Sequence, residues 1–461
     1  MKFHYKKLRQ SHISTMQLLV SGFLGIILAG AVLLWLPVSN QQPIAFIDAF
    51  FTSVSAVCVT GLVTIVPAAQ FTLFGKVILL ILIQVGGLGI IVCMTVFFML
   101  LGKRITLRQR IYIQQTYNMD TLSGMVRLIR WVLKVTLVVE AMGAIGYAIR
   151  FVPLYGIGKG IWYSIFHSIS AFCNAGIDIL GDSSLAGYVT DPVINLVTMA
   201  LIISGGLGFT VWSDILHVLK IRETYQRTPG RIFRQMSLQT KMTLVITGIL
   251  IAAGGIGIFC LEYSNADTIG AMSNGDKLLA SFFHAVSTRT AGFATVAQGG
   301  LRDATILFSC ILMFIGGSPG GTAGGIKTTT AGMLLFSCVA VLRGGKDTEC
   351  FGRKIAAENV RTGASIVMVA VLALLGGTIL VAAAEPAMAL GDVIYETTSA
   401  IGTVGLSTGI TPMLSDFSKC VIMFLMYIGR LGPVTVVLAF VSRQDIGKKA
   451  RKLPERRIMV G

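Results

Sequence analysis

Long apolar stretches constrain this chain more than any other feature. A helix needs about 20 mostly apolar residues to cross the hydrocarbon layer of a membrane, which is roughly 30 Å thick. Eight stretches meet this requirement, at 17–36, 72–101, 129–152, 192–219, 240–261, 304–341, 362–384 and 417–442. Only 13% of the residues are charged, against roughly 25% in a soluble domain. The sequence therefore predicts an all-α polytopic membrane protein with eight transmembrane helices.

The basic residues predict how these helices are oriented. Of the 38 Lys and Arg residues, 28 fall in segments that alternate helix ends would place on one side of the membrane. These segments are 1–16, 102–130, 220–241, 342–361 and 443–461. Short loops rich in Lys and Arg remain in the cytoplasm, so both termini are predicted to be cytoplasmic. The net charge of +17 is then a signal of topology, and no nucleic-acid partner is expected.

Within each pair of apolar stretches lies a shorter segment that is too short and too polar to span the bilayer. These segments read FFTSVSAVCVTGL (50–62), IFHSISAFCNAGI (165–177), FFHAVSTRTAGF (282–293) and YETTSAIGTVGL (395–406). Each carries a glycine near its end, and these are Gly61, Gly176, Gly292 and Gly405. A serine precedes the glycine by six residues in three segments and by five in the third. We interpret the four segments as re-entrant pore loops.

The pattern divides the chain into four parallel helix-loop-helix repeats. They cover 1–118, 119–228, 229–350 and 351–461, and the last includes a basic cytoplasmic tail. A second mark lies in the helix after each pore loop, where glycines occur at Gly86, Gly205, Gly316 and Gly429. All repeats have the same orientation, so they can surround one pseudo-fourfold pore, as the subunits of a tetrameric cation channel do.

The pore-loop ends have the chemistry of a cation filter. Rings of backbone carbonyls can replace the hydration shell of a cation, and glycine reaches the required backbone angles without steric cost. The predicted filter residues are Val59, Thr60, Gly61, Asn174, Ala175, Gly176, Thr290, Ala291, Gly292, Thr403, Val404 and Gly405. None of them is acidic, whereas calcium sites usually recruit Asp or Glu. This composition favours potassium, held at the filter residues alone.

Two further features lie at membrane depth. The stretch GGSPGGTAGG (316–325) interrupts the second helix of the third repeat, and irregular backbone there must line water or be buried in protein; a kinked helix is the alternative. Arg430 places a permanent cation inside a span, where charge is costly and usually functional. Pairing with an acid such as Glu140 is its other interpretation. Lys327 is either a surface lysine or an anchor for the loop.

The pore-loop ends and the GGSPGGTAGGIKTTT stretch resemble the Trk/Ktr/HKT superfamily of potassium transporters over the whole chain, and eight spans are most similar to the bacterial Ktr-type membrane subunit. The resemblance implies a location in the bacterial plasma membrane. It also implies that the interrupted helix is a gate beneath the filter. The gate residues would be Gly316, Gly317, Ser318, Gly320, Gly321, Gly324, Gly325, Lys327 and Arg430. Glycine in the first filter segment supports potassium over sodium.

The same resemblance implies partners. It predicts a homodimer and a cytosolic ring of nucleotide-binding regulatory subunits, with Na+ as a candidate activator. The nucleotide would bind the partner, since this chain encodes no nucleotide-binding domain, and no covalent cofactor is expected. The basic inner segments could dock the partner or contact anionic lipid. Residues 316–320 spell G-x-S-x-G, but membrane helices flank them, so we expect no enzyme. An ion-coupled (Na+ or H+) secondary transporter is the alternative function.

Overall fold

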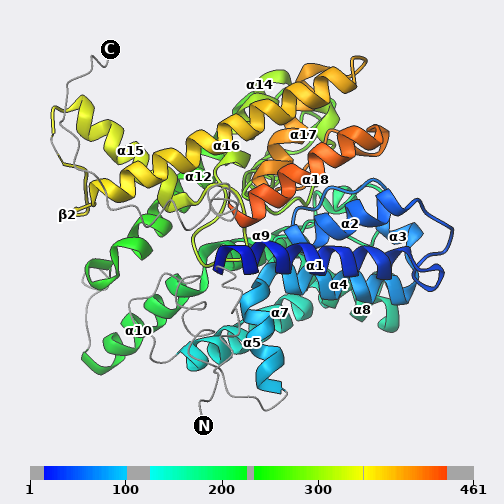
Figure 1. Ribbon diagram of the computed structural model, residues 1–461, viewed down its shortest axis with the longest axis horizontal. Coiled ribbons are helices and arrows are strands. Elements are labelled where there is room, and N and C mark those ends of the chain that lie inside the picture. The colour runs from blue at the N-terminus through cyan, green and yellow to red at the C-terminus, as the bar shows by residue number, and fades with distance from the viewer. Residues whose placement is uncertain (1–14, 101–124, 226–232, 346, 433–461) are drawn as a thin grey trace, which may run out of the picture.

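The computed structural model describes residues 15–100, 125–225, 233–345 and 347–432, and these ranges are almost entirely helical (Figure 1). A first helix, a short helix, a loop and a second helix follow one another four times along the chain. The first helices are α1 (Thr15–Trp35), α7 (Met125–Tyr155), α12 (Leu238–Glu262) and α16 (Ala357–Ala384). The short helices are α2 (Phe46–Cys58), α8 (Ile157–Phe172), α13 (Asn274–Ser287) and α17 (Leu390–Gly402).

The second helices are mostly in two pieces. They are α4 (Leu73–Leu88) with α5 (Ile90–Leu100), α9 (Pro192–Leu207) with α10 (Phe209–Tyr225), α14 (Asp303–Phe314) with α15 (Thr328–Leu342), and α18 (Asp416–Leu431). Between each short helix and the following second helix lies a single turn: α3 (Pro67–Gln70), or a 3-10 turn at Ala186–Tyr188, Gln298–Gly300 or Thr411–Met413. A fourth 3-10 turn follows α1 at Pro37–Ser39. The strands β1 (Glu349–Cys350) and β2 (Arg353–Lys354) form a small antiparallel hairpin.

The helices pack as a closed ring. Each first helix lies along the short helix that follows it, as α1 does along α2 and α7 along α8. Each second helix packs against the next short helix: α4 against α8, α9 against α13, α14 against α17, and α18 back against α2. In Figure 1 the β1–β2 hairpin, α10 and α15 lie at one end of the molecule, and α3 lies at the other. The four short helices are therefore enclosed by the longer ones.

The second helices differ from the sequence prediction. Continuous helices over 72–101 and 192–219 were expected, but Gly89 (φ +84°) separates α4 from α5 and Gly208 (φ +91°) separates α9 from α10. The bend between α9 and α10 is 94°. Gly432 (φ +86°) likewise ends α18, and residues 433–442 of the predicted stretch lie outside the described residues. A left-handed glycine ends the helical hydrogen bonding, so the break expected only in the third repeat is also found in the first and second repeats.

Burial is distributed as in a membrane protein. Leu372 and Ile379 of α16 are 61% and 67% exposed, whereas Thr397 and Ser399 of the enclosed α17 are fully buried. Apolar side chains thus cover the outside and hydroxyls fill part of the inside. By length and composition, α7, α12 and α16 can each cross a bilayer, and α9 with α10 adds a fourth if the bent pair is one span. Shorter apolar helices lie in three of the other predicted spans: Leu19–Trp35, Leu73–Leu88, and the pair Asp303–Phe314 and Thr328–Leu342.

Candidate functional site

The four loop ends share one backbone geometry. The residue two positions before each of the four glycines lies in the left-handed region although it is not glycine: φ is 55° at Val59, 58° at Asn174, 66° at Thr290 and 51° at Thr403. Two residues later the glycine is also left-handed, with φ of 100° at Gly61, 64° at Gly176, 81° at Gly292 and 96° at Gly405. Non-glycine residues rarely adopt such angles, and outliers cluster at functional sites. The repetition marks these segments as one site.

The recurrent serine of each short helix holds this backbone. The Oγ atoms of Ser55 and Ser399 accept hydrogen bonds from the N–H groups of Gly61 and Gly405, each at 3.0 Å. Ser170 instead donates to the carbonyl of Ile177 at 2.7 Å, and Ser287 donates to the carbonyl of Phe293. Every serine is fully buried. The serine-to-glycine spacing seen in the sequence therefore reflects a direct bond from the helix to the segment after it.

The glycines bring the four segments together in a ring. A Cβ atom added to Gly61 would lie 2.6 Å from the carbonyl oxygen of Ala175, and one on Gly176 would lie 2.5 Å from that of Ala291. A Cβ on Gly292 would lie 2.5 Å from the oxygen of Val404, and one on Gly405 would lie 2.1 Å from that of Thr60. Each repeat thus approaches the next, and the fourth approaches the first. All twelve predicted filter residues belong to this ring of segments.

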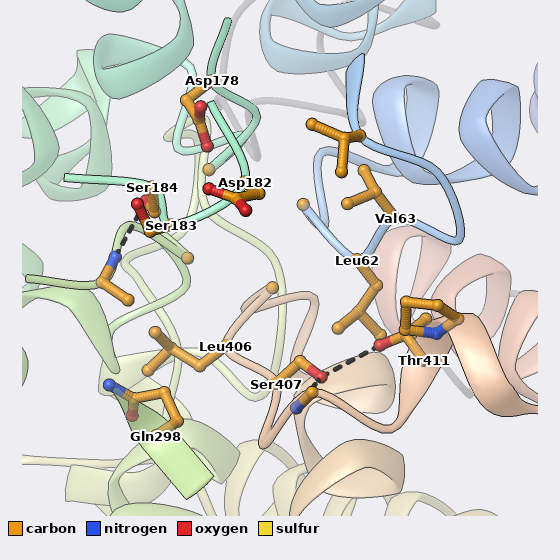
Figure 2. Close-up of a pocket in the computed structure, with 18 of the residues that line it drawn as sticks. Leu62, Val63, Asp178, Asp182, Ser183, Ser184, Gln298, Leu406, Ser407 and Thr411 are labelled. Atoms are coloured by element: carbon orange, nitrogen blue, oxygen red, sulfur yellow. Dashed lines mark hydrogen bonds between the residues drawn. The ribbon is translucent and has the colours of Figure 1, made fainter. Parts of the chain in front are cut away.

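A cavity of about 1040 Å³ opens above the ring. All four glycines line it, together with residues of the four loops that follow them. Figure 2 shows Asp178 and Asp182 on one side of this cavity, facing Leu62, Ser407 and Thr411 on the other. The twelve predicted filter residues carry no acid, so these two carboxylates supply negative charge at the entrance.

Asp178 lies in the loop after the second segment. Its Oδ1 accepts a hydrogen bond from the N–H of Leu180 at 3.2 Å. Burial raises the pKa of the Asp178 carboxyl to about 6, although backbone hydrogen bonds oppose the rise. The charge of Asp178 therefore changes in the mildly acidic range, and this residue was not among those predicted from the sequence.

The glycine-rich loop (residues 316–325) lies against the ring. A Cβ on Gly324 would lie 2.0 Å from the hydroxyl of Thr403, and Gly325 has φ of +63° and approaches the carbonyl of Gly402. Thr322 is fully buried, and its hydroxyl donates to the carbonyl of Phe172 at 2.9 Å. These contacts place the loop beneath the second and fourth segments. They leave no room for side chains at its glycines.

The bend between α9 and α10 holds the other side of this loop. The N–H groups of Ser318 and Thr322 donate to the carbonyls of Gly206 and Gly205, at 2.9 and 3.1 Å, and the N–H of Phe209 donates to the carbonyl of Gly320 at 3.0 Å. At Gly208 a Cβ would lie 2.7 Å from the carbonyl oxygen of Pro319. Broken helices expose backbone groups that must be satisfied inside a membrane, and here two breaks satisfy each other.

The ends of the loop are fixed from within the third repeat. The N–H of Gly316 donates to the carbonyl of Ile326 at 2.8 Å, and the N–H of Thr328 donates to that of Gly317 at 3.0 Å. The Lys327 ammonium donates to the carbonyl of Ala323 at 2.7 Å. Of the two alternatives for Lys327, the geometry is that of an anchor. Gly321 packs against the carbonyl of Gly205. The predicted gate residues of the loop are therefore in contact with one another and with the bend between α9 and α10.

Arg430 connects this loop to the first repeat. Its guanidinium donates to the carbonyl of Thr322 in the loop, to that of Gly86, and to that of Gly87 at 3.2 Å. The carbonyls at a helix end lack helical partners and carry partial negative charge, which suits a cation. Pairing with Glu140 does not occur: the carboxylate of Glu140 accepts instead from Gln84 at 3.0 Å.

Sequence reasoning missed several residues of this region. Thr322, Gly205 and Gly206 form hydrogen bonds that hold the loop. Asp178, in the cavity above the ring, follows Gly176 by two residues. The spacing of Asp178 from Gly176 was a visible signal. The role of Gly205 and Gly206 was not, because their carbonyls become available only through the break at Gly208. An apolar exterior around polar, ring-forming loop ends defines a polytopic helical membrane protein.

Comparison with known proteins identifies the family. The model of the TrkH family, described as "Cation transport protein", matches residues 3–449, and this chain belongs to that family. The Ktr system potassium uptake protein B of Bacillus subtilis is 41% identical over 429 residues, which cover 93% of each chain. The potassium/sodium uptake protein NtpJ of Enterococcus hirae is 37% identical over 461 residues, 99% of each chain. The predicted superfamily is thereby confirmed, and these relatives are named as uptake proteins, not enzymes.

A solved structure shows the same fold. The crystal structure of the potassium transporter TrkH from Vibrio parahaemolyticus superposes with a TM-score of 0.74 at 19% sequence identity. The match covers 96% of this chain and 87% of the other. At this sequence identity, the match shows that the two chains share a fold.

Proposed function

We propose that this chain is the ion-translocating subunit of a potassium uptake system of the Ktr type. Potassium moves inward along the axis of the four segments and is coordinated by their backbone carbonyls. The observation that carries this proposal is the closed ring in which each glycine faces the carbonyl oxygen of the next repeat. A ring of neutral carbonyls suits a monovalent cation that exchanges its hydration shell, and the names of the relatives point to potassium.

In this proposal the chain has eight spans and four re-entrant loops in the parallel repeats 1–118, 119–228, 229–350 and 351–461. Two helices separated by a left-handed glycine make one bent span, as α9 and α10 do. The basic segments lie inside, so both termini are cytoplasmic. The cavity above the ring then faces the outside, and the β1–β2 hairpin faces the cytoplasm.

The glycine-rich loop acts as the gate. It lies beneath the ring, it contacts Thr403 through Gly324, and Arg430 holds it to the first repeat. Moving such a loop costs few side-chain contacts, because glycines form most of it. Release of the Arg430 bonds would let the loop leave the axis.

Regulation is assigned to other chains. Relatives from Bacillus subtilis are named as parts of a Ktr system, which supports a cytosolic regulatory ring that binds the nucleotide, docked on the basic inner loops. The word sodium in the name of the Enterococcus hirae relative supports sodium stimulation. We also propose a homodimer; it is supported by the resemblance to the superfamily and not by the ring, because one chain already supplies all four segments.

A specific observation keeps the ion-coupled secondary transporter as a second candidate. Glu140 of α7 is only 5% exposed and is bonded to Gln84, whose Oε1 accepts from the thiol of Cys173 at 3.4 Å. Cys173 directly precedes the predicted filter residue Asn174, so an ionisable carboxyl is linked to the pathway. Coupling through this carboxyl predicts that Glu140→Gln abolishes uptake that depends on a Na+ or H+ gradient.

The test is rubidium uptake and potassium-dependent growth in a bacterium that lacks its own potassium uptake systems. The chain is expressed alone and with its cytosolic partner, as the parent and as Gly61→Ser. We expect saturable uptake that the partner controls, and reduced selectivity against sodium in Gly61→Ser. Potassium-independent behaviour in every combination would contradict the proposal.

A further inference from the structure

Glu396 is a buried carboxyl that the conduction pathway does not use. It lies in the middle of α17 and is 0% exposed. One oxygen, Oε1, accepts a hydrogen bond from the hydroxyl of Thr411. The other, Oε2, has no hydrogen-bond partner among the described residues. A buried charge is costly unless hydrogen bonds or an opposite charge stabilise it, and one oxygen of Glu396 has neither in the described part of the chain.

Glu262 is a buried carboxylate of the same molecule whose two oxygens both accept hydrogen bonds. It is 1% exposed at the end of α12. Its carboxylate accepts from Thr268 and Asn265, both at 2.6 Å, from the N–H of Arg302 at 3.0 Å, and from Thr305. Both oxygens are satisfied, as in a structural carboxylate. Both side chains are covered, and Glu396 differs from Glu262 in having one oxygen without a hydrogen bond to any described residue.

A chain of hydroxyls links Glu396 to the outer cavity. The N–H of Gly409 donates to Ser407 Oγ at 2.9 Å, and Ser407 Oγ lies 3.0 Å from the hydroxyl of Thr411, which bonds Glu396. Ser407 and Thr411 line the cavity above the ring, and Figure 2 shows the bond between them. Each hydroxyl can accept a proton on one side and donate one on the other, so the chain connects the carboxyl with the external solution.

The free oxygen suits a proton better than a metal ion. A metal cation needs several oxygen ligands in place of its hydration shell, and Oε2 has no hydrogen-bond partner among the described residues. Nearby cations do not compensate it either. The helices packed against α17 bring Asp303 on α14, Glu385 just after α16, and Asp416, Lys419 and Arg430 on α18, while α17 adds Asp392. Lys419 is paired with Asp48 and Asp416, and Arg430 with backbone carbonyls.

We propose that Glu396 is a proton-binding site, reached from the outer cavity through Ser407 and Thr411, and that the bound proton weakens potassium uptake. The inference rests on the proposed function, because it assigns the proton an effect on the filter. Glu396 lies one turn before Ser399 on α17, and Ser399 holds the N–H of Gly405. An ionised Glu396 adds negative charge behind the fourth segment and favours a cation there. Protonation removes that charge.

The test compares rubidium uptake at several external pH values, from mildly acidic to mildly alkaline, in the parent and in Glu396→Gln. In the parent, the rubidium concentration for half-maximal uptake rises as the pH falls. Glu396→Gln resembles the protonated form, so we expect a half-saturating concentration about fivefold above the alkaline parent value, with this part of the pH dependence removed. Asp178 also changes charge with pH, so both proteins are compared again in an Asp178→Asn background.

Matched variants separate proton binding from structural damage. Glu262→Gln removes an equally buried carboxyl, and we expect it to keep the pH profile of the parent. Thr411→Val removes the hydroxyl that stabilises the ionised form, so the midpoint of the profile moves to higher pH. A pH dependence that survives unchanged in Glu396→Gln, or one that Glu262→Gln removes equally, would overturn the site.

A spectroscopic measurement does not depend on transport. Infrared difference spectra between alkaline and acidic pH are recorded on the purified full chain in the Asp178→Asn background. They should show a carbonyl band of a protonated carboxylic acid that is absent when Glu396→Gln is added. The band would remain in Glu262→Gln. A spectrum of Glu396→Gln identical to that of the parent would refute the proton site, whereas absence of rubidium uptake in every variant would refute the proposed function.

Discussion

The ring of loop ends and the glycine-rich loop beneath it differ in symmetry: four repeats form the ring, and one repeat forms the loop. Four repeats contribute equally to the ring, each with a left-handed residue, a left-handed glycine and a serine that holds the backbone. The third repeat alone supplies the loop. Different partners from the second and fourth repeats hold it, and Arg430 connects it to the first. Symmetry thus fixes the part that must be rigid. The proposed gate, in contrast, is a single copy held by contacts that differ from one another.

The largest effect is expected where the ring has least space. Gly61→Ser places a Cβ 2.6 Å from a neighbouring carbonyl oxygen and a side chain on a residue with φ of +100°. Strain at such a position is about 1–3 kcal/mol, so we expect rubidium affinity to fall about 10–100-fold while sodium inhibition of uptake increases. The control is Gly376→Ser in α16, where no atom lies within 4 Å of the added Cβ. Equal uptake by the two variants would show that the ring is not the filter.

The closure of the ring can be tested next. Lys419 at the start of α18 pairs with Asp48 of α2 at 2.9 Å, and their side chains are 11% and 18% exposed. This pair joins the last repeat to the first. Lys419→Met leaves Asp48 unpaired, and we expect the purified protein to lose about 2 kcal/mol of stability, between the values for exposed and buried pairs. Adding Asp48→Asn should recover part of that loss; an additive double mutant would show that the pair does not couple the repeats.

Arg430 tests the attachment of the glycine-rich loop. Arg430→Gln removes the charge and two of the three carbonyl bonds, and Arg430→Lys keeps the charge but cannot reach Thr322 and Gly86 together. We expect both variants to raise rubidium uptake without the cytosolic partner about tenfold, since tenfold corresponds to about 1.4 kcal/mol. If Arg430→Lys behaves as the parent, charge alone retains the loop. If neither variant raises rubidium uptake in the absence of the partner, these bonds do not hold the loop in place.

The smallest effect concerns the entrance to the ring. Asp178→Asn removes a carboxylate from the cavity, so we expect the rubidium concentration for half-maximal uptake to rise about two- to fivefold at low ionic strength and less at high salt. The pKa of Asp178 is raised to about 6 by burial, so its charge is present above that pH and is lost below it. The parent and the variant should therefore converge as the external pH falls below about 6. If the ratio of the two half-saturating rubidium concentrations, variant to parent, is the same at all pH values, the charge of Asp178 does not cause the difference in uptake.

Much of this arrangement was predictable from local sequence. The serine and glycine spacing identified all four loop ends, because a bond within a few residues of one chain leaves a fixed interval. The broken second helices were missed, since a glycine in an apolar stretch is compatible with a straight helix, and only the neighbouring loop requires the bend at Gly208. The partner of Arg430 was also open, because backbone carbonyls have no sequence signature. Contacts between repeats depend on the closed ring, which no local pattern encodes.

The most direct measurement is an anomalous-scattering map of crystals grown with rubidium. We predict a peak on the axis between the carbonyl oxygens of Thr60, Ala175, Ala291 and Val404, the four atoms that face the glycines. The peak should weaken in Gly61→Ser and persist in Gly376→Ser. A rubidium peak beside Glu140, with none between the four segments, would contradict a carbonyl filter and would favour the coupled transporter.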